Sequence, residues 1–387
     1  MKKTTIVLSI LCFSLLLSCQ SDRSEKRQAA SDANQNKNLN QTPGLGYEFE
    51  NNGKDHDAPL LKESYTKTDL KGIRPPKSNE LSEAIAGTER YLKRKKRTHQ
   101  LSDELTVSDL QIKKTIKAVK KWQAEGGDLG DFVEFHQMDG EDNRGNMHFT
   151  GYYIPVLQVS KKKTDIYKYP LYRKPKSWNG KKPTREDIDN KKALAGKGLE
   201  ICYSSSLLEI YTMQVQGSGV VEYRNGDQKL LSFGGKNGYA YKSLGKYLVA
   251  EGLVPADKIS LDAIRKWAAE NPNDLQKTLN QNESYVFFKE NSGKPSGAAG
   301  VPLVAQHSVA VDKSLIPLGS VMLGKVPVLN SEGVLVRHDY RILFAHDVGG
   351  AIKKGHIDFF SGTGLAGENI ANALHHYGEV WLLLAKD

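Results

Sequence analysis

Short runs of strand-forming residues, separated by glycine and asparagine, most constrain the fold of this chain of 387 residues. From about residue 61 onward, runs such as Val220-Val221-Glu222-Tyr223 are followed by turn signals such as Asn225-Gly226. An Asn-Gly pair between two apolar runs is typical of a tight β-hairpin. This part of the chain is also longer than one ordinary core, so we expect two cores built mostly from β-strands.

Helical patterns are few. Ser108 and Gln111 form a capping-box pattern, and apolar residues follow at helix spacing until Gly126-Gly127. Further helices are predicted for residues 81–96, 241–250 and 260–272, and for the segment after Thr363. Because the rest of the body has the pattern of strands and turns, the sequence predicts a mainly β fold with peripheral helices.

The first twenty residues predict a lipoprotein export signal. Lys2 and Lys3 precede an uncharged run, too short to span a bilayer comfortably, that ends at Leu16-Leu17-Ser18-Cys19. This ending is similar to a bacterial lipoprotein cleavage box, so we expect residues 1–18 to be removed and Cys19 to carry lipid, with no transmembrane helix. Gln20 permits an outer-membrane lipoprotein facing the periplasm, with inner-membrane retention left open. The alternative is an ordinary cleaved signal with an incidental cysteine.

Residues 19–60 are predicted to form a flexible tether. They are rich in Ser, Asn, Gln, Asp and Lys and almost lack aliphatic side chains before Leu45. Such a segment buries too little apolar surface to offset the entropy lost on ordering. We therefore expect the folded body to search a polymer beside the membrane, over the several tens of Å that roughly forty flexible residues reach.

The three cysteines indicate a fold without disulfides. Cys12 would leave with the signal and Cys19 would carry lipid, so Cys202 would have no partner. Its apolar, strand-like surroundings predict a buried structural thiol and not a nucleophile.

The net charge of +10 is concentrated partly in Lys93–Arg97 and Lys161–Lys163. Such clusters suit nucleic acid, anionic lipid or an acidic polymer, or are simply solvated. The export signal argues against nucleic acid. Solvated charge and attraction to the cell wall or envelope lipid remain as alternatives.

No phosphate-binding loop, dinucleotide fingerprint or zinc pattern is visible. Gly217-Ser218-Gly219 lacks the third glycine and the helix of a dinucleotide fingerprint. His356, His375 and His376 have no cysteine partners at zinc spacing, so each is predicted to be a core or solvated histidine.

Two segments combine groups that suit carbohydrate. Phe149–Tyr153 places Tyr152 and Tyr153 beside a glycine, and residues 214–219 add the amide of Gln216 and the hydroxyl of Ser218 around Gly217. Sugar rings stack on aromatic faces, and amides and hydroxyls bond their oxygens. Each segment alone is also compatible with an ordinary strand or turn.

Two aspartates lie near the carboxyl end of the chain. Asp347 is followed by Gly349-Gly350, and Asp358 lies in an apolar run beside Phe359-Phe360. Desolvation there can raise a carboxyl pKa enough to keep a proton available for donation, which suits an acid catalyst. The alternative is that Asp358 caps the following helix and Asp347 holds a turn.

A set of motifs in a fixed order resembles the membrane-bound lytic murein transglycosylase A family from about Phe149 to Leu384. Besides the two aspartate segments, the motifs are residues 149–153 (FTGYY), 169–173 (YPLYR), 215–219 (VQGSG), 235–241 (GKNGYAY), 301–304 (VPLV), 316–319 (IPLG) and 376–381 (HYGEVW). The resemblance implies a double-psi β-barrel catalytic domain of residues 61–153 plus 291–387. It also implies a second, smaller β domain inserted at residues 154–290.

The resemblance also implies a reaction. A lytic transglycosylase would cleave the β-1,4 bond between N-acetylmuramic acid and N-acetylglucosamine in peptidoglycan and form 1,6-anhydromuramic ends, using a single Asp as acid and then as base. It further implies roles for residues. Asp358 falls on the family's catalytic aspartate, and Asp312, Asp347 and Asp358 would be the three aspartates of the module in the carboxyl-terminal part. Asp347 would hold Asp358 or the substrate and raise the carboxyl pKa by like-charge repulsion. Substrate contacts are predicted for Asp312 and for groove residues Tyr152, Tyr153, Gln216, Gly217 and Ser218.

The implied partners are peptidoglycan glycan strands and, through lipidated Cys19, the membrane; cell-wall synthesis proteins are further candidates. No cofactor and no metal are expected, although three acids together could also suggest a metal site. Two other functions remain open at this stage. One is a lipid-anchored envelope protein that binds peptidoglycan without cleaving it, and the other is a glucan hydrolase that needs a second carboxylate and water.

Overall fold

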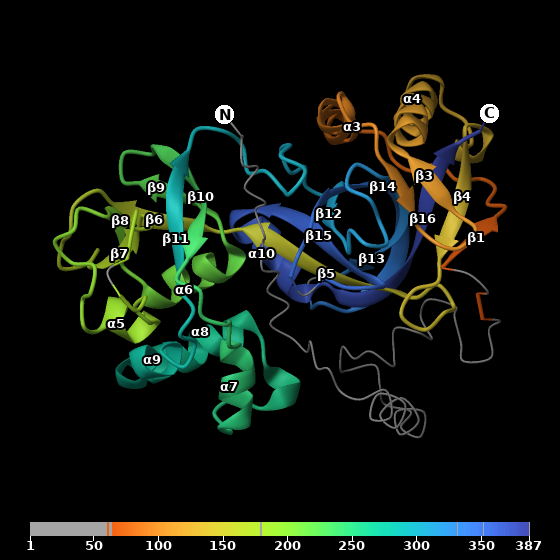
Figure 1. Ribbon diagram of the computed structural model, residues 1–387. Coiled ribbons are helices and arrows are strands. Elements are labelled where there is room, and N and C mark those ends of the chain that lie inside the picture. Colours follow the sequence, from red (N-terminus) through yellow and green to blue (C-terminus); the bar gives the residue numbers. More distant parts are fainter. Residues whose placement is uncertain (1–59, 62–63, 179, 331, 351, 387) are drawn as a thin grey trace.

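The computed structural model describes residues 60–61, 64–178, 180–330, 332–350 and 352–386. The predicted signal at 1–18, Cys19 and almost all of the predicted tether lie outside the described residues. No helix within these described ranges has the length and apolar character needed to cross a membrane. Figure 1 shows a barrel on one side and a smaller sheet with several helices on the other.

An 8-stranded sheet forms the larger body. Its strands are β1 (Tyr65–Thr68), β4 (Val133–Met138), β5 (Met147–Ile154), β12 (Ser308–Ala310), β13 (Val321–Leu329), β14 (Leu335–Asp347), β15 (His356–Thr363) and β16 (His375–Ala385). Their order is β1-β4-β16-β13-β14-β12-β15-β5, and β5 also pairs with β16. The strands from β16 to β5 therefore close into a barrel, and β4 and β1 extend the sheet beyond it.

A 6-stranded sheet forms the smaller body. Its strands are β6 (Val156–Ser160), β7 (Tyr169–Tyr172), β8 (Glu200–Ser204), β9 (Gly219–Tyr223), β10 (Gln228–Lys236) and β11 (Val286–Asn291). They follow the order β11-β10-β9-β6-β8-β7, and a bridge between Arg173 and Phe288 brings the two edges together. All of them lie in sequence between β5 and β12 of the barrel. The predicted mainly β class, a barrel with a smaller inserted β domain and peripheral helices, is confirmed.

Most helices lie around the two sheets (Figure 1), whereas α6 (Leu207–Gln216) is buried within the smaller body. The others are α3 (Asn79–Leu92), α4 (Asp109–Glu125), α5 (Arg185–Asp189), α7 (Leu244–Ala250), α8 (Leu261–Glu270), α9 (Pro272–Leu279) and α10 (Gly364–Ala373). Two 3-10 turns, η2 (Leu129–Asp131) and η3 (Ala256–Lys258), and the hairpin of β2 (Thr98–Gln100) and β3 (Thr106–Ser108) complete the described elements. Helices α3 and α4 pack on the barrel, and α10 lies between the two bodies.

The capping box predicted at the start of α4 is confirmed. The Ser108 hydroxyl oxygen accepts from the backbone N–H of Gln111 at 3.2 Å, and the Gln111 side-chain oxygen accepts from the backbone N–H of Ser108 at 2.8 Å. The helix predicted for 81–96 begins and ends earlier, at Asn79 and Leu92. Ser78 caps its start, and the basic run after Leu92 would place like charges at helix spacing, which destabilises a helix.

Three helices, α5, α6 and α9, correct the prediction that the rest of the body is strand and turn. In α6 every residue except Glu209 is buried, so no polar face reveals a helical period. Two local signals do mark its ends. Ser206 accepts from the backbone N–H of Glu209 at 3.2 Å, and Gly217 closes the helix in the left-handed region at φ 78°.

Candidate active site

The strand register aligns the two predicted acids in one row across the barrel. Asp347 pairs with Ala310, and Ala310 pairs with Asp358. Asp358 then pairs with Thr150, which pairs with His375. Paired residues point to the same face of a sheet, so the two acids are separated by the small side chain of Ala310 and by two strand spacings, about 10 Å between Cα atoms.

The acids face away from the barrel core. Phe149, Ile357 and Phe359 belong to the core cluster shared with α3 and α4, whereas Ala310 belongs to a separate cluster with Tyr152. Because side chains alternate along a strand, Thr150 and Asp358 lie on the same face as this second cluster. Two further members of that cluster, Leu303 and Ile352, come from loops beside β12 and β14. Val220 of β9 in the smaller sheet packs against the cluster.

Asp358 is 1% exposed and is hydrogen-bonded from a neighbouring strand. The Thr150 hydroxyl donates to Asp358 Oδ1 at 2.6 Å, and His356 Nε2 lies 2.8 Å from the same hydroxyl oxygen. A hydroxyl has one hydrogen, so when Thr150 donates to the carboxylate, the His356 Nε2–H must donate to Thr150. This chain of contacts fixes the orientation of one carboxyl oxygen of Asp358.

We predict that Thr150→Val lowers activity about tenfold while the protein remains folded, because valine keeps the shape of threonine and removes a hydrogen bond to a charged group. The check is the initial rate of the catalysed reaction. Thr115→Val is the matched control, because it removes a buried hydroxyl that bonds α4 and the end of β16 far from the acids. Equal rates for the two variants would contradict an orienting role for Thr150.

Asp347 is fully buried and holds a loop against the barrel. Its Oδ1 accepts from the backbone N–H groups of Ala298 and Val348, each at 2.9 Å, and its Oδ2 accepts from the Tyr152 hydroxyl at 3.2 Å. Gly297 permits this close approach, because a Cβ there would lie 2.5 Å from the carbonyl oxygen of His346. Burial, helped by the charge of Asp358 and opposed by these hydrogen bonds, raises the pKa of Asp347 from 3.8 to about 7.

The raised pKa of Asp347 predicts a pH dependence of stability. Between about pH 4 and 7 the folded chain holds a proton on Asp347 that the unfolded chain has released, so the contribution of this group to the free energy of unfolding falls as pH rises through that window. Asp347→Asn removes this titration. We expect its free energy of unfolding in urea, relative to the unchanged protein, to improve from pH 4 to pH 7. Parallel curves for the two proteins would refute this assignment.

The structure contradicts one half of the alternative interpretation, in which Asp358 caps a helix and Asp347 holds a turn. Asp358 does not cap the following helix: it lies inside β15, and α10 begins at Gly364 after Thr363. Asp347 does hold a loop, as that reading supposed. Its second contact, to Tyr152, also places it beside the predicted groove residues.

The predicted core or solvated histidines are core residues, and two of them join a buried cluster. His148 Nε2 lies 3.0 Å from His375 Nδ1, and the His148 ring stacks on His356 at 4.8 Å between ring centres. Burial lowers the pKa of His375 and of His376 to about 4, so both are neutral at neutral pH. The cluster lies behind Thr150 and supports the contact between His356 and Thr150. The sequence analysis missed the link from Thr150 to His356, because strand pairing was not visible in the motifs.

Asp312 is bonded to backbone and hydroxyl groups of its own domain. Its Oδ1 accepts from the backbone N–H and hydroxyl of Ser314 at 3.0 and 2.7 Å, and its Oδ2 accepts from the backbone N–H of Lys354 at 3.1 Å. Burial opposes the ionised form, but these hydrogen bonds outweigh it and lower the pKa of Asp312. Asp312 therefore fastens the loop between β14 and β15, and its predicted substrate contact stays a prediction.

The predicted groove residues lie on β5 and at the end of α6. Tyr152 contacts Asp347, and Tyr153 lies beside Glu368 of α10. Gln216, Gly217 and Ser218 are buried in the smaller body, where α6 turns into β9. The Tyr pair and the α6 end thus approach the junction from opposite bodies, and their contacts with substrate stay predictions.

An ion-pair network joins the two bodies, and the sequence analysis missed it. The Arg265 guanidinium of α8 bonds Glu209 of α6 at 2.9 and 3.1 Å and also bonds both carboxyl oxygens of Glu368 on α10. Helix α10 packs on the strands of the acid row through glycines, since a Cβ at Gly151 would lie 2.5 Å from the Cα of Ala371. The network therefore ties the smaller body to the helix that follows Asp358.

The two described cavities lie in the smaller body. One of about 530 Å³ lies beyond the ends of β6 and β9, and one of about 80 Å³ is lined by Gln214 and Gly217 near α6. Asp347 and Asp358 line neither of them. The strand register and the hydrogen bonds, and not a cavity, therefore bring the acid row together.

Metal binding and thiol chemistry find no support in the described ranges. No cluster of three or more His, Cys, Asp or Glu side chains there is arranged to hold a metal ion. Cys202 is buried in β8, as predicted, and burial raises the pKa of its thiol to about 12. At neutral pH this thiol is protonated and a poor nucleophile.

Similarity to known proteins covers most of the chain. The family model described as the MltA specific insert domain matches residues 148–289, and the 3D domain matches residues 307–384. A membrane-bound lytic murein transglycosylase A of Escherichia coli K12 is 41% identical over 274 residues, which cover 69% of this chain and 74% of that protein. The corresponding Vibrio cholerae protein is 38% identical over 273 residues, covering 68% and 74%.

A solved structure agrees with these relatives. The crystal structure of Escherichia coli MltA with bound chitohexaose superposes with a TM-score of 0.76 at 32% identity, covering 87% of this chain and 98% of that one. Sequence, insert domain, barrel module and three-dimensional arrangement thus lead to one conclusion: the chain belongs to the membrane-bound lytic murein transglycosylase A family.

Proposed function

We propose that this protein is a lytic transglycosylase of peptidoglycan. It would cleave the β-1,4 bond between N-acetylmuramic acid and N-acetylglucosamine and leave 1,6-anhydromuramic ends. The observation that carries the proposal is the placement of Asp358: a buried acid, oriented by Thr150, on the barrel face that meets the smaller body, in a chain of this family.

Asp358 acts first as an acid and then as a base. Its protonated carboxyl donates to the oxygen between the two sugars, and that bond breaks as positive charge develops at the anomeric carbon. The carboxylate then takes the proton from the C6 hydroxyl of the same muramic acid, whose oxygen bonds to the anomeric carbon. Because the nucleophile belongs to the substrate, its effective concentration is high and no water is consumed.

Asp347 supports this cycle without exchanging a proton with the sugar. Burial raises the pKa of Asp347 to about 7, so Asp347 itself holds a proton up to about neutral pH. Its negative charge, when present, disfavours a second negative charge nearby. Its bond from Tyr152 also ties this charge to the strand that carries the predicted groove residues.

Glycan strands occupy the junction between the barrel and the smaller body in this proposal. Tyr152 and Tyr153 lie on the barrel side, and Gln216, Gly217 and Ser218 lie on the other side. The chitohexaose in the Escherichia coli MltA structure is a linear sugar oligomer, and that protein shares the two-body fold. The domains of the proposal are residues 61–153 plus 291–387 for catalysis and 154–290 for the insert.

Product analysis tests the reaction. Purified sacculi digested in ¹⁸O-labelled water should release muropeptides that end in anhydromuramic acid and carry no label. Labelled reducing ends would identify a hydrolase. Binding without release would identify a non-catalytic envelope protein and would equally refute the proposal.

The protein is anchored at the outer membrane through lipid on Cys19 in this proposal, and it faces the periplasm. The relatives are named membrane-bound, which agrees with a membrane anchor. Cys19→Ala should release the protein into the soluble fraction of osmotically shocked cells. Retention of the variant in the membrane pellet at the level of the unchanged protein would exclude the lipid anchor.

A further inference from the structure

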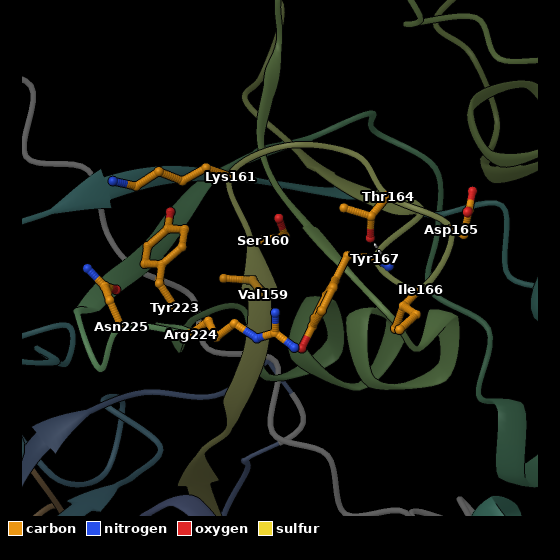
Figure 2. Close-up of a pocket in the computed structure, with 10 residues that line it drawn as sticks. All are labelled: Val159, Ser160, Lys161, Thr164, Asp165, Ile166, Tyr167, Tyr223, Arg224 and Asn225. Carbon is orange, nitrogen blue, oxygen red and sulfur yellow. Dashed lines mark hydrogen bonds between the residues drawn. The ribbon is translucent and has the colours of Figure 1, made fainter.

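A cavity in the smaller body lies away from the acid row. It has a volume of about 530 Å³, which is within the range of about 300–1,000 Å³ typical of ligand sites. Figure 2 shows the side chains that line it. They come from the end of β6, the loop that follows it, and the turn after β9: Val159, Ser160, Lys161, Thr164, Asp165, Ile166, Tyr167, Tyr223, Arg224 and Asn225.

The floor and one wall of this cavity are built by ordered backbone. Strands β6 and β9 are parallel and pair Val159 with Tyr223, so both end at the same edge of the sheet, where the cavity begins. The following loop is closed on itself: Thr164 N–H donates to the Tyr167 carbonyl at 3.0 Å, and Tyr167 N–H donates to Thr164 Oγ1 at 2.9 Å. The site is therefore present before any ligand arrives.

The cavity presents positive charge beside aromatic rings. Lys161 lies over the Tyr223 ring at 5.4 Å, and Figure 2 shows the Arg224 side chain pointing toward Tyr167. Within the described ranges, neither Lys161 nor Arg224 forms an ion pair with a carboxylate. Asp165 is the one acid of the lining, and Figure 2 places it at the far end of the loop from Arg224. One cation without a carboxylate partner in these ranges, Arg224, therefore faces the space between the two tyrosines, and Lys161 lies on the outer side of Tyr223.

This combination suits a carboxylate attached to a compact organic group. A guanidinium matches a carboxylate with two parallel hydrogen bonds, and tyrosine faces pack against peptide and aliphatic groups. A neutral sugar chain would leave the charge of Arg224 without a partner. Murein supplies the required chemistry, because its glycan strands carry short peptides with free carboxylates.

We propose that this cavity binds a carboxylate-bearing segment of the murein stem peptide, at a distance from the acid row. The proposal takes the murein substrate from the function proposed above and adds a second point of attachment on the inserted domain. All lining residues lie between Val159 and Asn225, and none belongs to the row of Asp347 and Asp358. The cavity would bind a stem peptide of the murein strand while the junction between the two bodies binds the glycan of the same strand.

Binding is tested with the full chain in detergent and the free stem tripeptide L-alanyl-γ-D-glutamyl-meso-diaminopimelate, measured by isothermal calorimetry. We expect Arg224→Gln to raise the dissociation constant about tenfold or more, because it removes a charged, two-point contact. The dissociation constant of Arg224→Lys should lie between those of the unchanged protein and Arg224→Gln, because lysine keeps the charge and loses the planar guanidinium. Arg337→Gln is the control, since Arg337 is an exposed arginine on β14 paired with Asp339. Equal dissociation constants for Arg224→Gln and Arg337→Gln would overturn the proposal.

A second measurement separates this site from the reaction. On intact sacculi, Arg224→Gln should raise KM, while on glycan strands stripped of peptides by an amidase its rate should equal that of the unchanged protein. Equal loss on both substrates would overturn the peptide assignment. Absence of anhydro products from the unchanged protein would refute the proposed reaction instead. The calorimetric measurement would still test tripeptide binding, because binding does not depend on the reaction. If Arg224→Gln lost binding to vesicles of anionic phospholipid but kept its binding to the tripeptide, the proposal would also be overturned. The cavity would then be assigned to a lipid headgroup.

Discussion

Asp358→Asn is expected to lower the release of anhydromuropeptides by about 10³-fold, the scale of a positioned acid-base group. Asparagine has nearly the same shape and can still accept the hydrogen bond of Thr150 through Oδ1. It cannot donate a proton and take it back. The loss should therefore appear in kcat, with binding to sacculi and the thermal unfolding midpoint close to those of the unchanged protein.

A matched control for this substitution is Asp339→Asn. Asp339 lies on β14 and pairs with Arg337 at the protein surface, so it tests the same chemical change away from the row. Mass spectrometry of digested sacculi measures both variants. If Asp358→Asn were as active as Asp339→Asn, Asp358 would not be the acid and base of the reaction.

Arg265→Met is expected to destabilise the protein by about 2 kcal/mol, because it leaves Glu209 and Glu368 without the cation that separates them. Arg265 is 28% exposed, so solvent reduces the cost below that of a fully buried pair. The measurement is urea unfolding at neutral pH. Activity should fall as well, since Glu368 lies on the helix that packs against the strands of Asp358 and Thr150.

Two further variants distinguish a charge effect from lost packing. Arg265→Met combined with Glu368→Gln removes one of the stranded charges and should recover part of the stability, as a coupled pair does in a double-mutant cycle. Arg337→Met removes an exposed arginine and should change stability by less than about 0.5 kcal/mol. Equal losses for Arg265→Met and Arg337→Met would show that the network contributes nothing.

Local signals in the sequence predicted local structure well. The capping box of Ser108 and Gln111 and the hairpin at Asn225-Gly226 depend on neighbouring residues, and both are present. Helix α6 was missed because it is buried almost all round, which erases the polar face that a period needs. The two acids were singled out by their apolar and glycine-rich surroundings, together with the family resemblance.

The contacts around the acids could not be predicted in the same way. Thr150 and Asp358 are separated by 208 positions along the chain, and their contact exists only because β5 and β15 pair in parallel. Arg265 and Glu368 are 103 positions apart and belong to different bodies. Such partners depend on strand order and on how the two bodies meet, and single motifs carry no information about either.

The closure of the barrel has a consequence for when activity can arise. Strand β5 precedes the whole smaller body, and its two barrel partners, β15 and β16, follow that body in sequence. Contacts so distant in sequence form late, because a long loop must first be closed. An emerging chain can thus fold its inserted sheet early but cannot assemble the row of acids until β15 and β16 have been made. Until those two strands pair with β5, Asp358 has no contact with Thr150 and the row is incomplete.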